Sequence, residues 1–86
     1  MKLIICTACY DVVCLRHKRR ACECGKSYGL YVDNINAEIG GYAVPLGFNN
    51  TSLVRALASR PYAGDGKRFE AFVIPKVCRS IKEEQQ

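Results

Sequence analysis

The chain has 86 residues, six of which are cysteine, and a formal net charge of +5. At this length we expect one domain, residues 1–86, whose marginal core needs support from a metal, disulfides or a partner subunit. No apolar run approaches the ~20 residues that cross a bilayer as a helix, which excludes a membrane protein of that kind.

The first residues influence how the cysteines are interpreted. Residues 1–6 lack the long apolar run and small-residue cleavage site of a secretory signal, so we expect a cytoplasmic protein. Clustered cysteines in that compartment bind metal more often than they form disulfides. The composition therefore favours a metal site over a disulfide framework.

The N-terminal third predicts short strands and two cysteine turns. Residues 2–6 and 11–15 are rich in Leu, Ile and Val, and the turn Cys6-Thr7-Ala8-Cys9 separates them. Residues 16–20 predict the tip of a hairpin whose returning strand is 21–23. Cys24-Gly25 closes the second turn, where glycine suits a positive φ.

The rest of the chain predicts further strands. Residues 28–33 alternate in polarity and predict a strand. Residues 42–48 predict an edge strand or a bulge, because Pro45 has no backbone N–H to donate. Residues 68–74 are apolar on both faces, which predicts a central strand or one covered by a partner, and so favours a homo-oligomer.

One helix is predicted after residue 49. Asn50 or Thr51 can cap its N-terminus, and Pro61 ends it. Its apolar stripe comprises Leu53, Leu57 and either Val54 or Ala56. At two to three turns, such a helix depends on packing for its stability.

Two closely spaced cysteine pairs predict a tetrahedral metal site made of Cys6, Cys9, Cys22 and Cys24. Two residues separate the first pair, one separates the second, and twelve lie between the pairs. Four thiolates suit zinc, with iron as the chemical alternative. A closed shell of four cysteines leaves no open coordination position, so one structural zinc ion is expected.

Three other residues are weaker candidates as ligands. Cys14 is interpreted as a small buried hydrophobic residue, and Cys78 as a core or free thiol that could replace one of the four ligands. His17 lies among arginines and lysines, which favours a solvated side chain over a ligand.

The two cysteine turns and the strands between them resemble a zinc ribbon over about the first 30 residues. The whole chain also resembles small uncharacterised proteins of bacteria and phages. The motifs that carry this second resemblance are R-x-C-x-C-G-x-S-x-G-x-Y-x-D, A-V-P-L-G-F-N-N-x-S-L and F-E-A-F-V-I-P. The expected fold class is α+β: zinc-ribbon hairpins (1–32), an antiparallel sheet with one short helix (33–80) and a frayed polar tail (81–86).

The clearest binding motif is a run of cations at the predicted hairpin tip. Arg16, Lys18, Arg19 and Arg20 could contact a phosphate backbone, with salt-sensitive and weakly sequence-specific binding. A solvated turn would have the same composition. The expected partner is nucleic acid or a nucleic-acid-handling complex.

A second candidate site is polar and contains the start of the helix. A helix N-terminus attracts anions, so these loops could bind a small anionic, nucleotide-like ligand, or a host protein, although ordinary helix capping also explains part of the set. The residues are Asp33, Asn34, Asn36, Asn49, Asn50, Thr51 and Ser52.

Enzyme signatures are absent from the sequence. The chain has one histidine, no phosphate-binding loop and no pair of carboxylates placed for acid–base chemistry. We therefore expect a non-catalytic binding protein.

Overall fold

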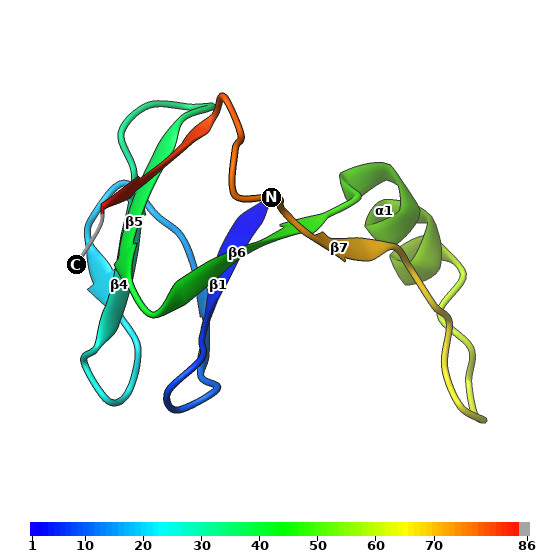
Figure 1. Cartoon of the computed structure of the whole chain (residues 1–86). Coiled ribbons are helices and arrows are strands. Elements are labelled where there is room, and N and C mark those ends of the chain that lie inside the picture. Colours follow the sequence, from blue (N-terminus) through cyan, green and yellow to red (C-terminus); the bar gives the residue numbers. More distant parts are fainter. Residues whose placement is uncertain (85–86) are drawn as a thin grey trace.

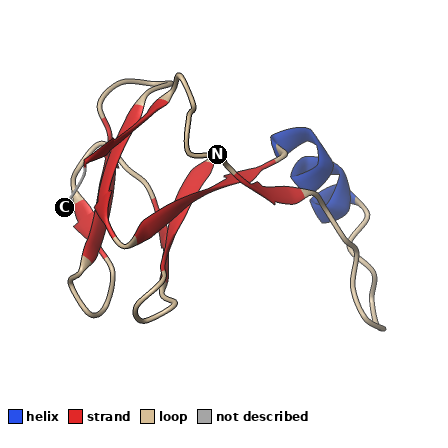
Figure 2. Ribbon diagram, viewed as in Figure 1, coloured by secondary structure: helices blue, strands red, loops and turns tan. Residues whose placement is uncertain are grey.

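The computed structural model describes residues 1–84, which form a small β-rich α+β domain with two four-stranded sheets and one helix (Figures 1 and 2). The first sheet has the order β2-β1-β6-β7 and the second the order β3-β4-β5-β8. The elements are β1 (Lys2–Cys6), β2 (Val12–Cys14), β3 (Arg20–Ala21), β4 (Ser27–Tyr31), β5 (Ala37–Gly41), β6 (Ala43–Phe48), α1 (Asn50–Ala58), β7 (Ala71–Val73) and β8 (Ile81–Glu84). No helix among the described residues is long and apolar enough to span a bilayer.

The main core lies where the two sheets face each other. The first sheet contributes Ile4, Val13 and other buried side chains, and the second contributes Ile39, which is fully buried. Buried residues alternate with half-buried ones along β6, as expected for a strand with one buried face. This cluster is small, which agrees with the marginal core expected for the length.

Gly41 allows the chain to pass from the second sheet to the first. Only Tyr42 separates β5 from β6, so the backbone turns a corner there. Gly41 has φ +74°, and a Cβ at this position would collide with the backbone carbonyl of Lys26. The corner therefore requires glycine for both its dihedral angle and its close approach.

The region around α1 extends away from this core as an arm, defined here as α1 and residues 59–73 (Figure 1). The radius of gyration is 14.2 Å and the longest dimension 45 Å, whereas a compact domain of this length has a radius near 12 Å. Only Ala56 is buried in α1, and Val54 and Leu57 are 62% and 66% exposed. The sequence predicted a short helix that depends on packing against the sheet. In the structure, the helix does not pack on the main core.

The bounds of the helix also differ from those predicted. Asn49, one residue before the predicted caps Asn50 and Thr51, is the N-cap, and its side chain accepts a hydrogen bond from the Ser52 N–H. The helix ends at Ala58 with Ser59 as its C-cap, ahead of Pro61.

The prediction that Pro45 marks an edge strand or bulge was wrong. Pro45 is buried in β6, which lies between β1 and β7. The Pro45 carbonyl accepts a hydrogen bond from Ile74 N–H at 2.9 Å, so its backbone polar groups point toward β7 and not toward β1. Because these groups face away from β1, the missing N–H interrupts no ladder bond with β1. On the other side, Pro45 lies just beyond the paired part of β7, whose last residue, Val73, pairs with Leu46.

The strand predicted at 68–74 is shorter and lies elsewhere in the sheet. It reduces to β7, whose three residues are all exposed and form an edge. The apolar residues on its two faces therefore lie at an exposed edge and not at the centre of the sheet.

Two further predictions fail because strands pair over long range. Strands β2 and β3 belong to different sheets, so residues 16–20 cross between sheets and are not the tip of a hairpin. The tail predicted to fray from residue 81 instead forms β8, which pairs parallel to β5, with Ala37 opposite Ile81. The second sheet is therefore mixed and not purely antiparallel, and residues 85–86 of the predicted tail lie outside the described residues.

Candidate metal centre

The first cysteine turn connects β1 to β2. Cys6 is the last residue of β1, and its carbonyl accepts a hydrogen bond from Tyr10 N–H at 2.7 Å. The Ala8 N–H points at the Cys6 sulfur, at 3.3 Å. Tyr10 follows the second thiol, Cys9, with φ +61°, in the left-handed region that non-glycine residues rarely adopt.

The second turn connects β3 to β4 and has the same design despite its shorter cysteine spacing. Gly25 N–H donates to the Cys22 carbonyl at 3.0 Å, and Gly25 has φ +78°, which confirms the expected positive φ. A left-handed residue thus follows the second thiol in both turns. The Asp11 carboxylate in the first turn accepts a hydrogen bond from Glu23 N–H in the second, at 2.9 Å, which holds the two turns together.

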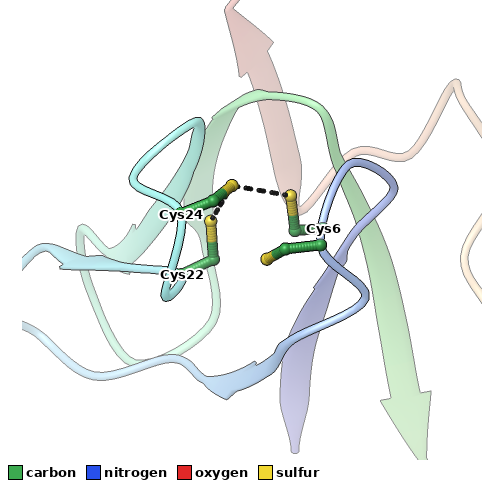
Figure 3. A group of neighbouring side chains, drawn as sticks. Cys6, Cys22 and Cys24 are labelled. Carbon is green, nitrogen blue, oxygen red and sulfur yellow. Dashed lines mark hydrogen bonds between the residues drawn. The ribbon is translucent and has the colours of Figure 1, made fainter.

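These turns bring together the four cysteines predicted from the spacing, Cys6, Cys9, Cys22 and Cys24. Their sulfur atoms all lie within 4.8 Å of one another. The Cys6–Cys24 and Cys22–Cys24 sulfur distances are 3.7 and 3.4 Å, and Figure 3 shows these side chains converging from the two turns. A tetrahedral ion with metal–sulfur bonds of ~2.3 Å requires sulfurs ~3.8 Å apart. The four cysteines could therefore hold one metal ion with little movement.

The four thiols differ in their surroundings. Cys6 and Cys22 are buried, Cys9 is half-buried and Cys24 is exposed. The Ser27 hydroxyl is the main cause that lowers the pKa of Cys6 to about 6, with help from the backbone N–H groups of the turn. Burial acts to raise the pKa of Cys22, but the Ser27 N–H and the Cys24 thiol outweigh it, so that pKa is also lowered.

The exposed thiol behaves in the opposite way. The Lys26 N–H acts to lower the pKa of Cys24, but the neighbouring Cys22 thiol and burial outweigh it and raise that pKa to about 12. The pKa is therefore lowered at the two buried thiols, Cys6 and Cys22, and raised at the exposed thiol of Cys24. Thiolates are the form that binds metal.

The other candidate ligands lie apart from this cluster. All six cysteines are free thiols. Cys14 lies half-buried on β2, and Cys78 packs against the core with its sulfur 3.5 Å from the Ser80 hydroxyl. The His17 ring faces the Tyr31 ring, 5.9 Å away.

The basic segment, residues 16–20, begins at the end of β1 opposite the thiols. Cys14, just before it, pairs with Leu3 near the start of β1, whereas Cys6 ends that strand. The four cations predicted to bind phosphate, Arg16, Lys18, Arg19 and Arg20, are all exposed. β1 spans five residues, so Arg16 begins the segment roughly 13–17 Å from the Cys6 end of that strand. Arg20 ends the segment in β3, two residues before Cys22.

Two of these cations are held in place by the chain. Arg20 donates to the Cys14 carbonyl at 2.9 Å, and the Arg19 guanidinium stacks over the Tyr28 ring at 3.7 Å. The Tyr28 ring in turn lies flat over Gly40, where a Cβ would strike it. The crossover between the sheets is thus ordered and presents its cations to solvent.

In the first polar loop, the side chains bind the loop itself. The Asp33 carboxylate accepts hydrogen bonds from the Ile35 and Asn36 N–H groups and from the Asn36 side chain, at 2.7 to 2.8 Å. The Asn36 side chain is the main cause that lowers the pKa of Asp33 to about 2. Asn34 is exposed beside them. These contacts are those of an ordered turn.

The second polar set likewise bonds to its own chain. Asn49 caps α1 and reaches the Glu70 carboxylate at 3.3 Å, and the Asn50 side chain accepts from the N-terminal ammonium at 3.1 Å. The Ser52 hydroxyl donates to the Asn49 carbonyl and accepts from Glu70 N–H. Thr51 is exposed. The two polar loops line different hollows of the surface, so the structure does not join them into one site.

Sequence reasoning missed two residues of the centre. Ser27 is fully buried beside the thiols, and Tyr10 takes the left-handed position of the first turn. Two features of the sequence could have indicated Ser27. It lies three residues after Cys24, and it shares the buried face of β4 with Gly29. Comparisons with protein-family models, curated proteins and solved structures find no match, so the interpretation of the centre rests on its geometry.

Proposed function

We propose that the four cysteines bind one zinc ion in a structural role, as in a zinc ribbon, and that the domain is a non-catalytic module that contacts nucleic acid. The observation that carries the metal assignment is that all four sulfurs lie within 4.8 Å of one another, close to the ~3.8 Å spacing of a zinc–thiolate tetrahedron. The ion would join the β1–β2 turn of the first sheet to the β3–β4 turn of the second. Four ligands from the protein complete its shell, so substrate chemistry at the metal is not part of this proposal.

The charge distribution supports a nucleic-acid contact at the basic segment. Four thiolates around a divalent ion carry a net charge of −2. This negative charge would be located at the β1–β2 and β3–β4 turns. Arg16, Lys18, Arg19 and Arg20 carry +4 along the crossover that runs from the far end of β1 to β3. A polyanion is therefore attracted to the basic segment and repelled from the metal end.

The geometry of the segment suits phosphate and not base recognition. Arg19 is stacked on Tyr28 and Arg20 is bonded to Cys14, which orients two guanidinium groups before any ligand arrives. Arg16 and Lys18 project beside them. Because Arg19 covers one face of the Tyr28 ring, that face is not open to a stacking base. The expected binding is sensitive to salt and only weakly selective for sequence.

The proposal is tested with two triple variants of equal charge change. Arg16→Ser, Lys18→Ser and Arg19→Ser remove three cations from the basic segment and keep Arg20, whose side chain bonds the backbone. The control removes three exposed cations from the arm, Arg60→Ser, Lys67→Ser and Arg68→Ser.

Binding of a labelled duplex is measured by fluorescence anisotropy as salt is raised. The first variant should lower the salt slope by about 2.7 for three lost phosphate contacts on duplex DNA, and the control should leave it unchanged. Equal effects of the two variants would mean that only net charge matters. No binding by the zinc-loaded native chain at ~50 mM salt would refute the nucleic-acid function.

A second candidate function, protein binding, is favoured by the arm. A hollow of about 280 Å³ there is lined by the apolar Leu53, Leu57 and Phe69 and by the cations Arg60 and Lys67. Tyr62 beside it is fully exposed. This combination is complementary to a partner segment with an apolar anchor flanked by acidic residues, the kind of contact expected of a small host-interaction protein.

Selection from random displayed peptides tests this candidate. Acidic peptides with a central apolar residue should be enriched on the native chain and lost on a Leu57→Lys variant. Enrichment that is unchanged by this substitution, or peptides without acidic residues, would refute it. Self-association measured by sedimentation, abolished by the same substitution, would mean that a second copy covers the hollow instead.

A further inference from the structure

We infer that Ser27 is a positioning residue of the metal centre, whose hydroxyl donates a hydrogen bond to the metal-bound thiolate of Cys6. The inference rests on the proposed metal-binding function and assigns to this centre a donor outside the four ligands. It follows from the burial of Ser27, from its unpaired hydroxyl and from the different exposure of the four sulfurs.

Ser27 cannot turn its hydroxyl to solvent. It is the first residue of β4, it is fully buried, and its carbonyl accepts the Cys22 N–H at 2.9 Å. On the other side it pairs with Gly41 in β5, the residue at the crowded corner between the sheets. Both neighbours therefore hold the Ser27 backbone, and its full burial means that the side chain faces the interior.

The hydroxyl lacks an ordinary partner there. Among the described residues, the Ser27 oxygen is a buried side-chain polar atom that makes no hydrogen bond of good geometry. A buried unpaired hydroxyl destabilises a fold, and native structures rarely retain one without a reason. The strand register brings Cys6 close to it, because Ser27 pairs with Gly41, and Ala43, two residues further along, pairs with Cys6.

Cys6 is the ligand that most needs such a donor. Its side chain is fully buried, whereas Cys24 is exposed and water can solvate its sulfur. When Cys6 binds metal as a thiolate, its negative charge is compensated by the ion and by N–H or O–H donors of the protein. The Ala8 N–H supplies one donor at 3.3 Å, and a rotation of the Ser27 hydroxyl supplies the second.

The test compares Ser27→Ala with Thr7→Val. Thr7 follows Cys6 directly, but its hydroxyl is exposed and donates to the Tyr42 carbonyl at 3.1 Å, so the control removes a nearby hydroxyl that does not face the sulfur. Zinc affinity is measured by competition with a chelator. The cobalt(II) form is used to record the sulfur-to-metal charge-transfer band.

Ser27→Ala should weaken zinc binding roughly 10- to 100-fold, the range found for other partners of metal ligands. It should also move the charge-transfer band to lower energy, because a thiolate without its hydrogen bond is a better electron donor. Thr7→Val should change neither. In the metal-free chain, Ser27→Ala should lower thermal stability less than in the zinc-loaded chain, because without the metal the hydroxyl makes no hydrogen bond of good geometry.

Two results would overturn the inference. One is unchanged zinc affinity and an unchanged charge-transfer band in Ser27→Ala. The other is equal destabilisation of the metal-free and metal-loaded forms, which would show a role in packing alone. If the native chain binds no metal at all, the proposed metal function fails together with this inference, and that result is distinct from the first two.

A measurement on the native chain covers the case in which Ser27→Ala does not fold. With an NMR-active cadmium isotope in place of zinc, the Ser27 hydroxyl proton should exchange slowly and show scalar coupling to the metal through the Cys6 sulfur. A hydroxyl proton that lacks this coupling in the cadmium-loaded protein would refute the hydrogen bond directly.

Discussion

Removal of the metal should destabilise the domain strongly, because the four thiols join turns that belong to separate sheets. The perturbation is a strong chelator added to the zinc-loaded chain. Zinc present at about 1,000 times its Kd stabilises the folded state by ~4 kcal/mol. A domain of 86 residues has a total stability of roughly 4–13 kcal/mol.

The expected size of the effect follows from these figures. For a domain of this length, 1 kcal/mol corresponds to about 4–8 °C in Tm, so chelation should lower Tm by roughly 16–32 °C. The small core between the sheets offers little to compensate. Circular dichroism follows the unfolding, and elemental analysis of the untreated protein should find one zinc per chain.

Matched cysteine variants identify the ligands. Cys6→Ser should abolish stoichiometric metal binding, whereas Cys14→Ser and Cys78→Ser should retain it, because their thiols lie outside the cluster. A chelator that leaves Tm unchanged would refute the reasoning. Native mass spectrometry that finds the mass of a disulfide-bonded chain without a bound ion would also refute it. Detection of iron in place of zinc would change only the identity of the metal.

Three further predictions concern single residues and are checked by urea unfolding in excess zinc. Tyr10→Gly should stabilise the domain by about 1 kcal/mol, because Tyr10 occupies the left-handed region at φ +61°; a loss of stability would show that its side chain matters more than its backbone. Gly41→Ala should destabilise by about 3 kcal/mol or more, since a positive φ and a backbone collision add, whereas Gly25→Ala, with open space around it, should lose only about 1 kcal/mol. Asp33→Asn should lower stability at neutral pH, because the folded pKa near 2 lies below the ordinary 3.8, so that the native carboxylate stabilises the fold above pH 3.8 and loses that effect as pH falls toward 2. The native chain should therefore lose its advantage over Asp33→Asn as pH falls from 3.8 toward 2, and an advantage that is unchanged across this window would contradict the assignment.

The features that the sequence predicted well are those that adjacent residues control. Two cysteine pairs with short spacing can only form tight turns, and Gly25 takes the positive φ that such a turn requires. The strand at 2–6 and the existence of a helix after residue 49 follow from local composition in the same way. The four cysteines meet because each pair lies in the turn of its own hairpin.

The features that failed depend on which strands pair. The segment 16–20 has the composition of a hairpin tip, but β2 and β3 join different sheets, and nothing within the segment encodes that choice. The polar tail contains one apolar residue, Ile81, and its burial in the core draws residues 81–84 into a parallel strand. Pro45 is tolerated inside the first sheet because its backbone faces the short strand β7, which only the register reveals.

The sequence alone thus determined the ligand set of the candidate metal centre and its two turns, since spacing along the chain limits how thiols can converge. Tertiary structure decided that these turns belong to two sheets, that the cations lie on the crossover between those sheets, and that an arm extends from the core. It also placed Ser27 beside the buried sulfur of Cys6. Those outcomes depend on strand pairing and burial, because the contacts of each residue are made with residues that are distant in the sequence.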